Sequence, residues 1–348
     1  MKQIVSETAI LNKKNSLQYL NLNLPNPIRN QVLVKIFYSG VCASQFMEYK
    51  LLRGKDKWLP HMFGHEAVGI VERVGNGVKK LRVGEKVILS WINCKKNQKN
   101  VSGYLRYKKK KINYGPISTF SNYSLISQDR VYKLPKTIKF KNGFLFGCAI
   151  PTGMGIVVNE AKPKKKDICL VVGLGGVGIF SLIALRALKI ENVAGVDISQ
   201  KKINFLKKLG FKNLINIKNI NSVRKINKIF KNKKIDFVFD SSGKVKSIEF
   251  FFNMLNEKTG KLYFSSHPEN GKKLSLDPHE LISGKKIFGS WGGSSNLNRD
   301  ILKFSRLITK SKIKLEKLYK VYPLKKLKKI FENFSKNVEP RCVLKMKH

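Results

Sequence analysis

A glycine-rich segment, Gly173-Leu174-Gly175-Gly176-Val177-Gly178, has the residue types and spacing that suit contact with phosphates. Gly173 permits a tight turn, Gly175 lets the backbone approach a pyrophosphate, and Gly178 lets a helix pack closely on a strand. The segment follows an apolar strand-like run and opens a helix, whose N-terminus offers unpaired N–H groups and a positive dipole. We therefore expect this loop, including Gly176 and Val177, to bind a dinucleotide.

An acidic residue stands at the position that would read the adenosine ribose. Asp197 ends the next expected strand, 24 residues after Gly173. A carboxylate there accepts hydrogen bonds from the ribose hydroxyls and repels a 2′-phosphate, which favours NAD over NADP. Lys201 and Lys202 follow closely, and either could instead meet a phosphate, so we include Lys202 among the cofactor-binding candidates.

The elements around this loop alternate between strand and helix. This alternation, at this spacing, predicts a doubly wound parallel sheet of the Rossmann type. We expect strands at Ile168–Val172, Asn192–Val196, Ile235–Phe239 and Gly260–Ser265, and helices at Val177–Leu188 and Gln200–Leu209.

The remaining chain has a different pattern. Short β-rich runs with glycine turns predict a partly open β-barrel before residue 150, and helices followed by a closing strand return after residue 291. We thus expect an α/β protein with a barrel domain formed by residues 1–149 and 291–348, and a nucleotide domain formed by residues 150–290. The barrel strands are expected at Val32–Tyr38, Gly69–Val74 and Lys86–Ser90, the later helices at Arg299–Lys310 and Leu324–Phe334, and the last strand at Arg341–Met346.

Three further elements carry polar side chains that could do chemistry. They are Gly40-Val41-Cys42-Ala43-Ser44, Gly64-His65-Glu66, and Cys148 followed by Pro151-Thr152-Gly153. Taken singly, each thiol or imidazole could be an ordinary core residue. Together with the glycine loop, the Ser283-Gly284-Lys285-Lys286 run and the closing Arg341 strand, they resemble the zinc-containing medium-chain alcohol dehydrogenases, and most of all the glutathione-linked formaldehyde and general alcohol branch. The resemblance covers nearly the whole chain and implies a GroES-like barrel beside the Rossmann domain.

The resemblance assigns expected roles to individual residues. It implies one catalytic zinc held by Cys42, His65 and Cys148, with the fourth position open. Glu66 would lie close behind the metal, and Ser44 would take the alcohol proton. Thr152 and Val177 would contact the nicotinamide, Arg341 the pyrophosphate, and Trp91 and Tyr114 the substrate cleft.

The chain also departs from the family pattern. Met47 stands where many members continue a proton relay with histidine, Gln45 where an aspartate orients the zinc-bound histidine, and Ala43 where a cation often touches the pyrophosphate. The family's second, structural zinc needs four cysteines, whereas the stretch from Cys94 to Lys111 has one, so we expect that zinc to be absent. The lysine-rich stretch Lys95–Lys111 is expected to be an exposed loop.

The formal charge of +47 is extreme, yet the lysines are scattered in short runs. Composition drift toward lysine, asparagine and isoleucine accounts for such scatter, and no nucleic-acid motif is present. The five cysteines, odd in number and widely spread, indicate reduced thiols in the cytoplasm rather than disulfides, with Cys169 and Cys342 as packing residues. No signal peptide and no membrane span are expected. His61 and His267 match no family role and are expected to be ordinary structural residues.

These observations predict a zinc-dependent, NAD(H)-linked alcohol dehydrogenase acting on a small alcohol or carbonyl compound, with a homodimer as its assembly. A polyol or sugar-alcohol dehydrogenase remains an alternative. A zinc-free quinone or enone reductase would not need Cys42, His65 and Cys148. A polyanion-binding protein on the same scaffold is supported only by the charge.

Overall fold

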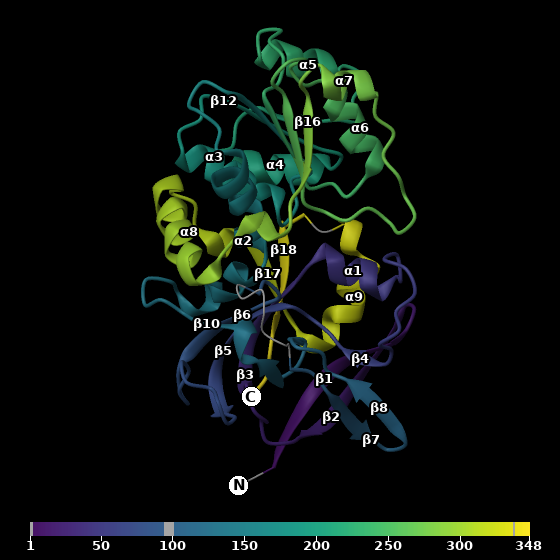
Figure 1. The fold of residues 1–348 in the computed structure, drawn as a ribbon, viewed down its shortest axis with the longest axis vertical. Helices are drawn as coiled ribbons and strands as arrows, with labels where there is room; N and C mark the ends of the chain where they lie inside the picture. The colour runs from purple at the N-terminus through teal and green to yellow at the C-terminus, as the bar shows by residue number, and fades with distance from the viewer. Residues whose placement is uncertain (1–2, 94–100, 337) are drawn as a thin grey trace.

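The computed structural model describes residues 3–93, 101–336 and 338–348. In these ranges the strands form one parallel sheet and two mostly antiparallel sheets. Figure 1 shows the parallel sheet in the upper half of the molecule and the other two sheets in the lower half, with β18 reaching up between them. The fold is therefore a GroES-like half-barrel joined to a Rossmann-type layer structure.

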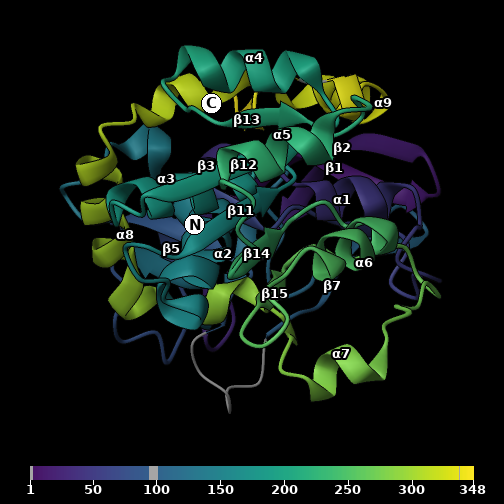
Figure 2. The ribbon, with the colours of Figure 1, turned by 90° about the horizontal axis from the view of Figure 1, so that it is seen from above.

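The parallel sheet has the strand order β13-β12-β11-β14-β15-β16. Figure 2, in which the molecule is seen from above, shows helices on both sides of these strands. The strands are β11 (Ile168–Val172), β12 (Asn192–Asp197), β13 (Leu214–Asn216), β14 (Phe237–Asp240), β15 (Lys261–Phe264) and β16 (Lys286–Gly289). The helices that follow them are α3 (Gly178–Ala187), α4 (Gln200–Lys208), α5 (Ser222–Ile229), α6 (Val245–Asn253) and α7 (Pro278–Ile282).

Strand β11 lies between two hydrophobic cores, one on each face of the parallel sheet. Its side chains alternate between two cores, because successive residues of a strand point to opposite faces. Cys169 and Val171 pack with helix α3, whereas Leu170 and Val172 pack with helix α6. All of them are buried, which explains the continuous apolar run in the sequence.

The lower half contains the two remaining sheets. One has the order β2-β1-β4-β8-β7 and the other β10-β6-β5-β3-β18-β17, with β9 also paired to β3. Their strands are β1 (Ile4–Lys13), β2 (Ser16–Leu24), β3 (Gln31–Val41), β4 (His61–Met62), β5 (Glu66–Val74), β6 (Lys86–Ser90), β7 (Tyr104–Tyr107), β8 (Lys110–Asn113), β9 (Tyr123–Ser127), β10 (Val131–Lys133), β17 (Tyr319–Pro323) and β18 (Arg341–Lys345).

The remaining elements are helices and turns. The α-helices are α1 (Ala43–Tyr49), α2 (Ala149–Gly155), α8 (Leu297–Ser311) and α9 (Leu327–Glu332), and η3 (Ile156–Ala161) is a π-helix. The 3₁₀ turns are η1 (Gln128–Arg130), η2 (Phe140–Gly147), η4 (Gly292–Ser294), η5 (Leu315–Leu318), η6 (Leu324–Lys326) and η7 (Phe334–Lys336). Among the described residues no single helix has the length and apolar composition to cross a membrane, although the bent pair Phe140–Gly147 and Ala149–Ala161 passes that test.

The lysine-rich stretch differs from the sequence expectation. Residues 95–100 lie outside the described residues, but the rest of the stretch leads into the hairpin β7–β8 instead of an open loop. Leu105 pairs with Ile112, and both side chains are buried. This alternation of apolar and basic residues buries one face of the hairpin and leaves the lysines exposed.

Candidate metal and nucleotide site

Three side chains from distant parts of the chain converge. The ligand atoms of Cys42, His65 and Cys148 all lie within 4.8 Å of one another. Cys42 stands between β3 and α1, His65 directly precedes β5, and Cys148 links η2 to α2. Two thiols and one imidazole at this separation match the ligand chemistry of Zn²⁺.

Helix α1 fixes the position of Cys42. Cys42 is its N-cap residue, and its backbone N–H donates to Oε1 of Gln45 over 2.7 Å, which forms a capping box. Gln45 stands at the position where family members orient the histidine. Here its carbonyl oxygen instead holds the backbone of the cysteine, and its buried Nε2 has no hydrogen-bond partner among the described residues.

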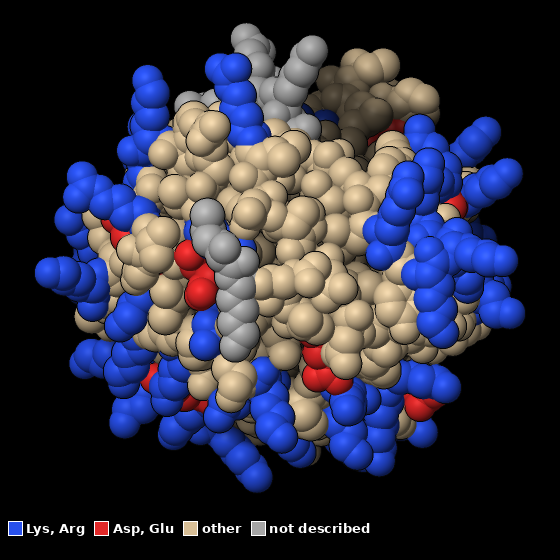
Figure 3. Space-filling view, turned by 90° about the horizontal axis from the view of Figure 1, so that it is seen from below, with Lys and Arg blue, Asp and Glu red and all other residues tan. Residues whose placement is uncertain are grey.

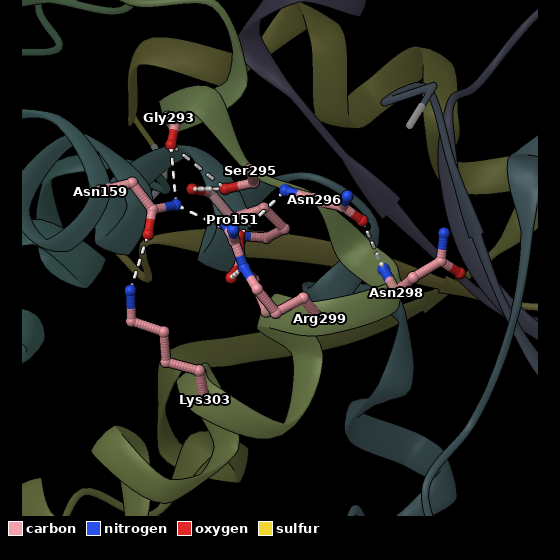
Figure 4. A network of polar contacts seen from close by, with 9 residues as sticks. Pro151, Asn159, Gly293, Ser295, Asn296, Asn298, Arg299 and Lys303 are labelled. Atoms are coloured by element: carbon pink, nitrogen blue, oxygen red, sulfur yellow. Dashed lines mark hydrogen bonds and ion pairs between the residues drawn. The ribbon is translucent and has the colours of Figure 1, made fainter. Parts of the chain in front are cut away.

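A polar network holds the turn that carries Cys148. The Thr152 backbone N–H donates to the Cys148 carbonyl over 3.0 Å, and Ser295 Oγ donates to the Pro151 carbonyl over 2.9 Å. Figure 4 shows this contact beside Asn159, whose Nδ2 donates to the Gly293 carbonyl over 3.1 Å. Helix α2 is thereby tied to η4 and to the start of α8.

The residue before His65 must be a glycine. Gly64 has φ +98°, and a Cβ there would lie 2.6 Å from Oγ1 of Thr119. Both the backbone conformation and the lack of space exclude a side chain. Gly64 therefore lets the chain turn so that His65 enters the group formed with Cys42 and Cys148.

Behind this group lies a buried ion pair. Arg341 Nη2 is 2.8 Å from Oε1 of Glu66, and both side chains are almost fully buried. Burial raises the pKa of Glu66, and the positive charge of Arg341 opposes that shift. Burial also lowers the pKa of Arg341, but the attraction of Glu66, Cys42 and Cys148 together outweighs this effect, and the net shift is upward. Arg341 stays charged as a result.

The two thiols differ in acidity. A hydrogen bond from Cys148 holds the pKa of Cys42 well below the usual thiol value, and Arg341 lowers it further. The same hydrogen bond raises the pKa of Cys148. The pair thus releases its first proton readily, while a nearby cation would favour loss of the second.

Unpartnered polar atoms surround this group and test whether a metal fits there. His65 Nε2, Ser44 Oγ, Thr152 Oγ1 and Trp91 Nε1 are all buried without a hydrogen-bond partner among the described residues. Buried polar atoms are normally satisfied, so such a concentration points to missing ligands. The free imidazole nitrogen and two thiols fit a zinc ion, and the hydroxyls fit a bound polar substrate.

The glycine loop adjoins the same group. Gly173 has φ +80°, and a Cβ on Gly178 would lie 1.9 Å from the Gly173 carbonyl oxygen. Gly175 has open space instead, since a Cβ there would meet nothing within 4 Å. The turn at Gly173 and the close helix contact at Gly178 are as expected, and the open space at Gly175 leaves room for the approach to a pyrophosphate that stays a prediction.

Two close contacts connect the glycine loop to the surroundings of Cys42, His65 and Cys148. A Cβ on Gly153, one residue after Thr152, would lie 2.3 Å from the Val177 carbonyl oxygen. A Cβ on Gly176 would lie 2.8 Å from Nη1 of Arg341. The guanidinium group of Arg341 therefore reaches both Glu66 and the glycine loop.

Asp197 lies beside the loop, buried at the end of β12. Its Oδ2 accepts from the Leu174 backbone N–H and its Oδ1 from the Ser199 backbone N–H, each over 2.8 Å. Each carboxylate oxygen can accept a second hydrogen bond. Lys202 follows in the first turn of α4 and is half-buried.

Aromatic side chains stand next to His65. The Trp91 ring is 6.4 Å from the His65 ring and 5.1 Å from that of Trp291, which in turn is 5.8 Å from the His267 ring. Trp291 was not among the expected site residues because it lies 200 positions after Trp91, and His267 was expected to be an ordinary structural residue. Only the tryptophan in Ser290-Trp291-Gly292-Gly293, beside glycines, could have drawn attention to this segment.

The expectation for Tyr114 needs correction. The structure places its ring in a core cluster with Leu33 and Leu125, and its hydroxyl accepts from Nε2 of Gln31 over 3.1 Å. A ring enclosed by these side chains does not line a cleft with Trp91. Cys94 lies outside the described residues, while Cys169 and Cys342 are buried packing residues, as expected.

Comparisons with known proteins match this arrangement. The family model of the alcohol dehydrogenase GroES-like domain matches residues 28–136, and that of the zinc-binding dehydrogenase matches residues 176–309. Together they span more than two thirds of the chain.

Relatives cover nearly its whole length. An alcohol dehydrogenase of Malus domestica is 26% identical over 92% of this chain and 91% of its own. A probable S-(hydroxymethyl)glutathione dehydrogenase of Schizosaccharomyces pombe is 24% identical over 96% of this chain and 94% of its own. In structure, the benzyl alcohol dehydrogenase of Acinetobacter calcoaceticus superimposes with a TM-score of 0.87 at 24% identity, covering 100% of both chains. With its half-barrel, its parallel sheet and both family models in order along the sequence, the chain belongs to the zinc-type medium-chain dehydrogenase/reductase superfamily.

Proposed function

We propose that this protein is a zinc-dependent, NAD(H)-linked alcohol dehydrogenase. It would move a hydride between an alcohol, or the matching carbonyl compound, and the nicotinamide. The observation that carries the proposal is the convergence of Cys42, His65 and Cys148 within 4.8 Å, beside a glycine loop. The alcohol dehydrogenases among the relatives support an alcohol as the substrate.

Cys42, His65 and Cys148 would hold the zinc, and the glycine loop would hold the pyrophosphate of NAD. When bound, the zinc supplies a Lewis acid to the substrate oxygen and the nicotinamide supplies the hydride acceptor. Glu66 and Arg341 keep a fixed charge pair behind the thiols. Thr152 and Val177, joined by the close approach at Gly153, would position the nicotinamide ring.

Ser44 is the group that would accept the alcohol proton. Its Oγ is buried and unpartnered among the described residues, two positions after Cys42. Met47 cannot pass that proton on, because a thioether carries no exchangeable proton. The proton would therefore leave through a cofactor hydroxyl or through water. Trp91, whose ring lies 5.1 Å from that of the exposed Trp291, would narrow the substrate cleft.

A panel of primary and secondary alcohols with NAD or NADP, followed by the absorbance of the reduced nicotinamide, tests the proposal. We expect turnover with NAD as the preferred cofactor and loss of activity after chelation. Cys148→Ala should lower the rate more than about 100-fold, since loss of a ligand exceeds the loss of a supporting contact. Cys169→Ala, a buried cysteine in β11, is the matched control and should keep the wild-type rate.

No turnover of any alcohol by zinc-loaded protein would contradict the proposal. Turnover that survives both chelation and Cys148→Ala would instead favour a zinc-free reductase of the same superfamily.

We also propose that the protein forms a homodimer through the parallel sheet. In the described part of the chain, β16 is an edge strand that pairs only with β15. Phe288 on it and Ile282 just before it are exposed, and exposed strand edges with apolar side chains favour pairing with a second copy. Light scattering on the purified protein would measure the molar mass of this assembly, which we expect to be that of two chains.

A further inference from the structure

A second group of ligand-type side chains lies outside the site described above. It consists of Glu48 on α1, Asp56 in the following loop, and His61 at the start of β4, and its ligand atoms all lie within 4.8 Å of one another. His61 Nε2 is 2.9 Å from Oδ2 of Asp56 and 3.6 Å from Oε1 of Glu48. The group shares no residue with Cys42, His65 and Cys148.

The hydrogen bonds around the group orient its members. His61 Nδ1 is 2.9 Å from the Met62 carbonyl oxygen, and a carbonyl can only accept, so Nδ1 carries the proton. In the neutral ring, Nε2 is then the nitrogen with a free lone pair, and it faces both carboxylates. Asp56 Oδ1 accepts from the Trp58 backbone N–H over 2.9 Å, which directs Oδ2 toward His61. Metal-binding histidines are oriented in this same way by a backbone carbonyl.

Among the described residues no lysine or arginine forms an ion pair with the group, although Arg53 is near enough to act on Glu48 electrostatically. The chain has 69 lysines and arginines against 22 acidic residues, and every other ion pair among the described residues includes a lysine or arginine. In that part of the chain, Glu48 and Asp56 have only His61 as an ion-pair partner. With both carboxylates ionised and His61 charged, these three side chains would together carry one net negative charge.

The spacing suits a small metal ion. Zinc binds imidazole nitrogen and carboxylate oxygen at about 2.0–2.2 Å, which places tetrahedral ligand atoms about 3.4 Å apart. The two separations of 2.9 and 3.6 Å lie on either side of that value. An imidazole among the ligands favours a transition metal over Mg²⁺ or Ca²⁺, which prefer oxygen alone.

We propose that Glu48, Asp56 and His61 form a second metal site, which takes a divalent transition cation of the zinc type. The side chains of Asp56 and His61 are largely buried, with 14% and 8% exposure, while Glu48 at 29% leaves an entry path. A cation there would tie α1 to β4 and fix the loop between them.

This loop matters to the rest of the molecule because it touches the nucleotide half. The Asn270 backbone N–H donates to the Leu52 carbonyl over 2.8 Å. Gly54, at φ +100°, leaves room for the Asn270 side chain, since a Cβ there would lie 3.3 Å from its Cγ. A metal at His61 would therefore stiffen a contact across the two halves.

Metal content after exhaustive dialysis, measured by mass spectrometry on zinc-loaded protein, tests the proposal. We expect two zinc equivalents per wild-type chain and one in His61→Gln. The double variant Cys42→Ser/Cys148→Ser should keep one equivalent, and adding His61→Gln to it should remove that one. His279→Gln, at an exposed histidine, is the matched control and should keep two.

Cobalt substitution identifies the ligands directly. Cobalt bound to thiolates gives intense charge-transfer bands in the near ultraviolet, whereas cobalt bound to nitrogen and oxygen gives only weak visible bands. In Cys42→Ser/Cys148→Ser, cobalt should produce the weak bands alone, and Glu48→Gln or Asp56→Asn should weaken its binding at least tenfold. These two variants keep the side-chain shapes and serve if His61→Gln fails to fold.

Two results would overturn the site. One is a wild-type chain that holds a single equivalent, lost entirely in the double cysteine variant. The other is an unchanged metal content in His61→Gln and Glu48→Gln. Either result would make the group a plain histidine–carboxylate ion cluster. The measurement of metal content does not depend on turnover. Failure of the alcohol dehydrogenase proposal would therefore leave the proposal of a second metal site intact.

Discussion

Arg341 shows how one side chain can serve two parts of a site. Its guanidinium group contacts Glu66 behind the thiols and lies against Gly176 of the glycine loop. Residue spacing could not have revealed this contact, because Glu66 and Arg341 are 275 positions apart. The resemblance assigned Arg341 to the pyrophosphate, and that role stays a prediction beside the observed ion pair.

Breaking this pair should be costly. Arg341→Gln would leave Glu66 buried and unpaired, and removal of one partner of a buried ion pair costs about 3–5 kcal/mol. We expect the free energy of unfolding, measured in urea, to fall by that amount. Arg106→Gln, at an exposed strand position in β7, is the control and should change it by less than about 0.5 kcal/mol.

The double variant Glu66→Gln/Arg341→Gln separates charge from packing. It should be more stable than Arg341→Gln alone, because no isolated charge remains buried. Equal stability of the two variants would show that the charge of Glu66 does not matter to folding.

Among the helices and strands, the sequence predicted best those whose apolar residues form an uninterrupted pattern. Strands β6 and β11 occur where they were expected, since each is an apolar run that ends at a turn. Strand β14 is shorter than expected, because Ile235 makes only an isolated bridge to Leu255. The hairpin β7–β8 was missed because lysines mask its alternation.

The meeting of side chains that are distant in the sequence could not be derived from the periodicity of apolar residues. The meeting of Cys42, His65 and Cys148 came from resemblance, whereas Trp291 and the Glu48–Asp56–His61 group had no signal of that kind. These side chains meet only through the packing of distant segments. The domain boundaries at residues 149–150 and 290–291 stay predictions.

One buried carboxylate, that of Asp300, links η3 to the start of α8. Asp300 Oδ2 accepts from the Asn296 backbone N–H over 2.9 Å and from Asn159 Nδ2 over 3.3 Å, and Arg299 pairs with the same carboxylate. Burial raises the pKa of Asp300, but the contacts with Arg299 and Asn296 outweigh it and lower the pKa overall. A lowered folded-state pKa adds stability above the unfolded value, about 3.9, and that stability is lost as the pH falls through the folded-state value.

We therefore expect Asp300→Asn to lower the free energy of unfolding by about 1–3 kcal/mol at pH 7. The difference from wild type should shrink as the pH falls below about 4. Urea unfolding across a pH series would measure this. Asp277→Asn, at the exposed cap of α7, is the control, and a difference independent of pH would argue against the role of the charge.

For the whole molecule, charge is the dominant property. Figure 3 shows lysines and arginines around the rim of one face, with few acidic groups among them. They do not gather into one stripe there, which agrees with composition drift. A charge of +47 still produces self-repulsion in the compact state.

Salt should consequently stabilise this protein. Raising NaCl shortens the screening length from about 10 Å at 0.1 M toward about 3 Å at 1 M. We expect the thermal midpoint to rise over this range, because the exposed ion pairs that salt weakens contribute little. Differential scanning fluorimetry with an equal osmolality of sucrose as control would measure it, and a falling midpoint in salt would contradict the expectation.

The pairing of β18 with β3 has a consequence for synthesis. Val343 and Leu344 pair with Gly40 and Ser39, so the strand that leads to Cys42 gains this neighbour only from the far end of the chain. Arg341, which starts β18, also lies against Gly176 of the glycine loop. During translation, a nascent polypeptide can thus complete neither the pairing beside Cys42 nor the contact of Arg341 with the glycine loop until residues 341–345 have left the ribosome.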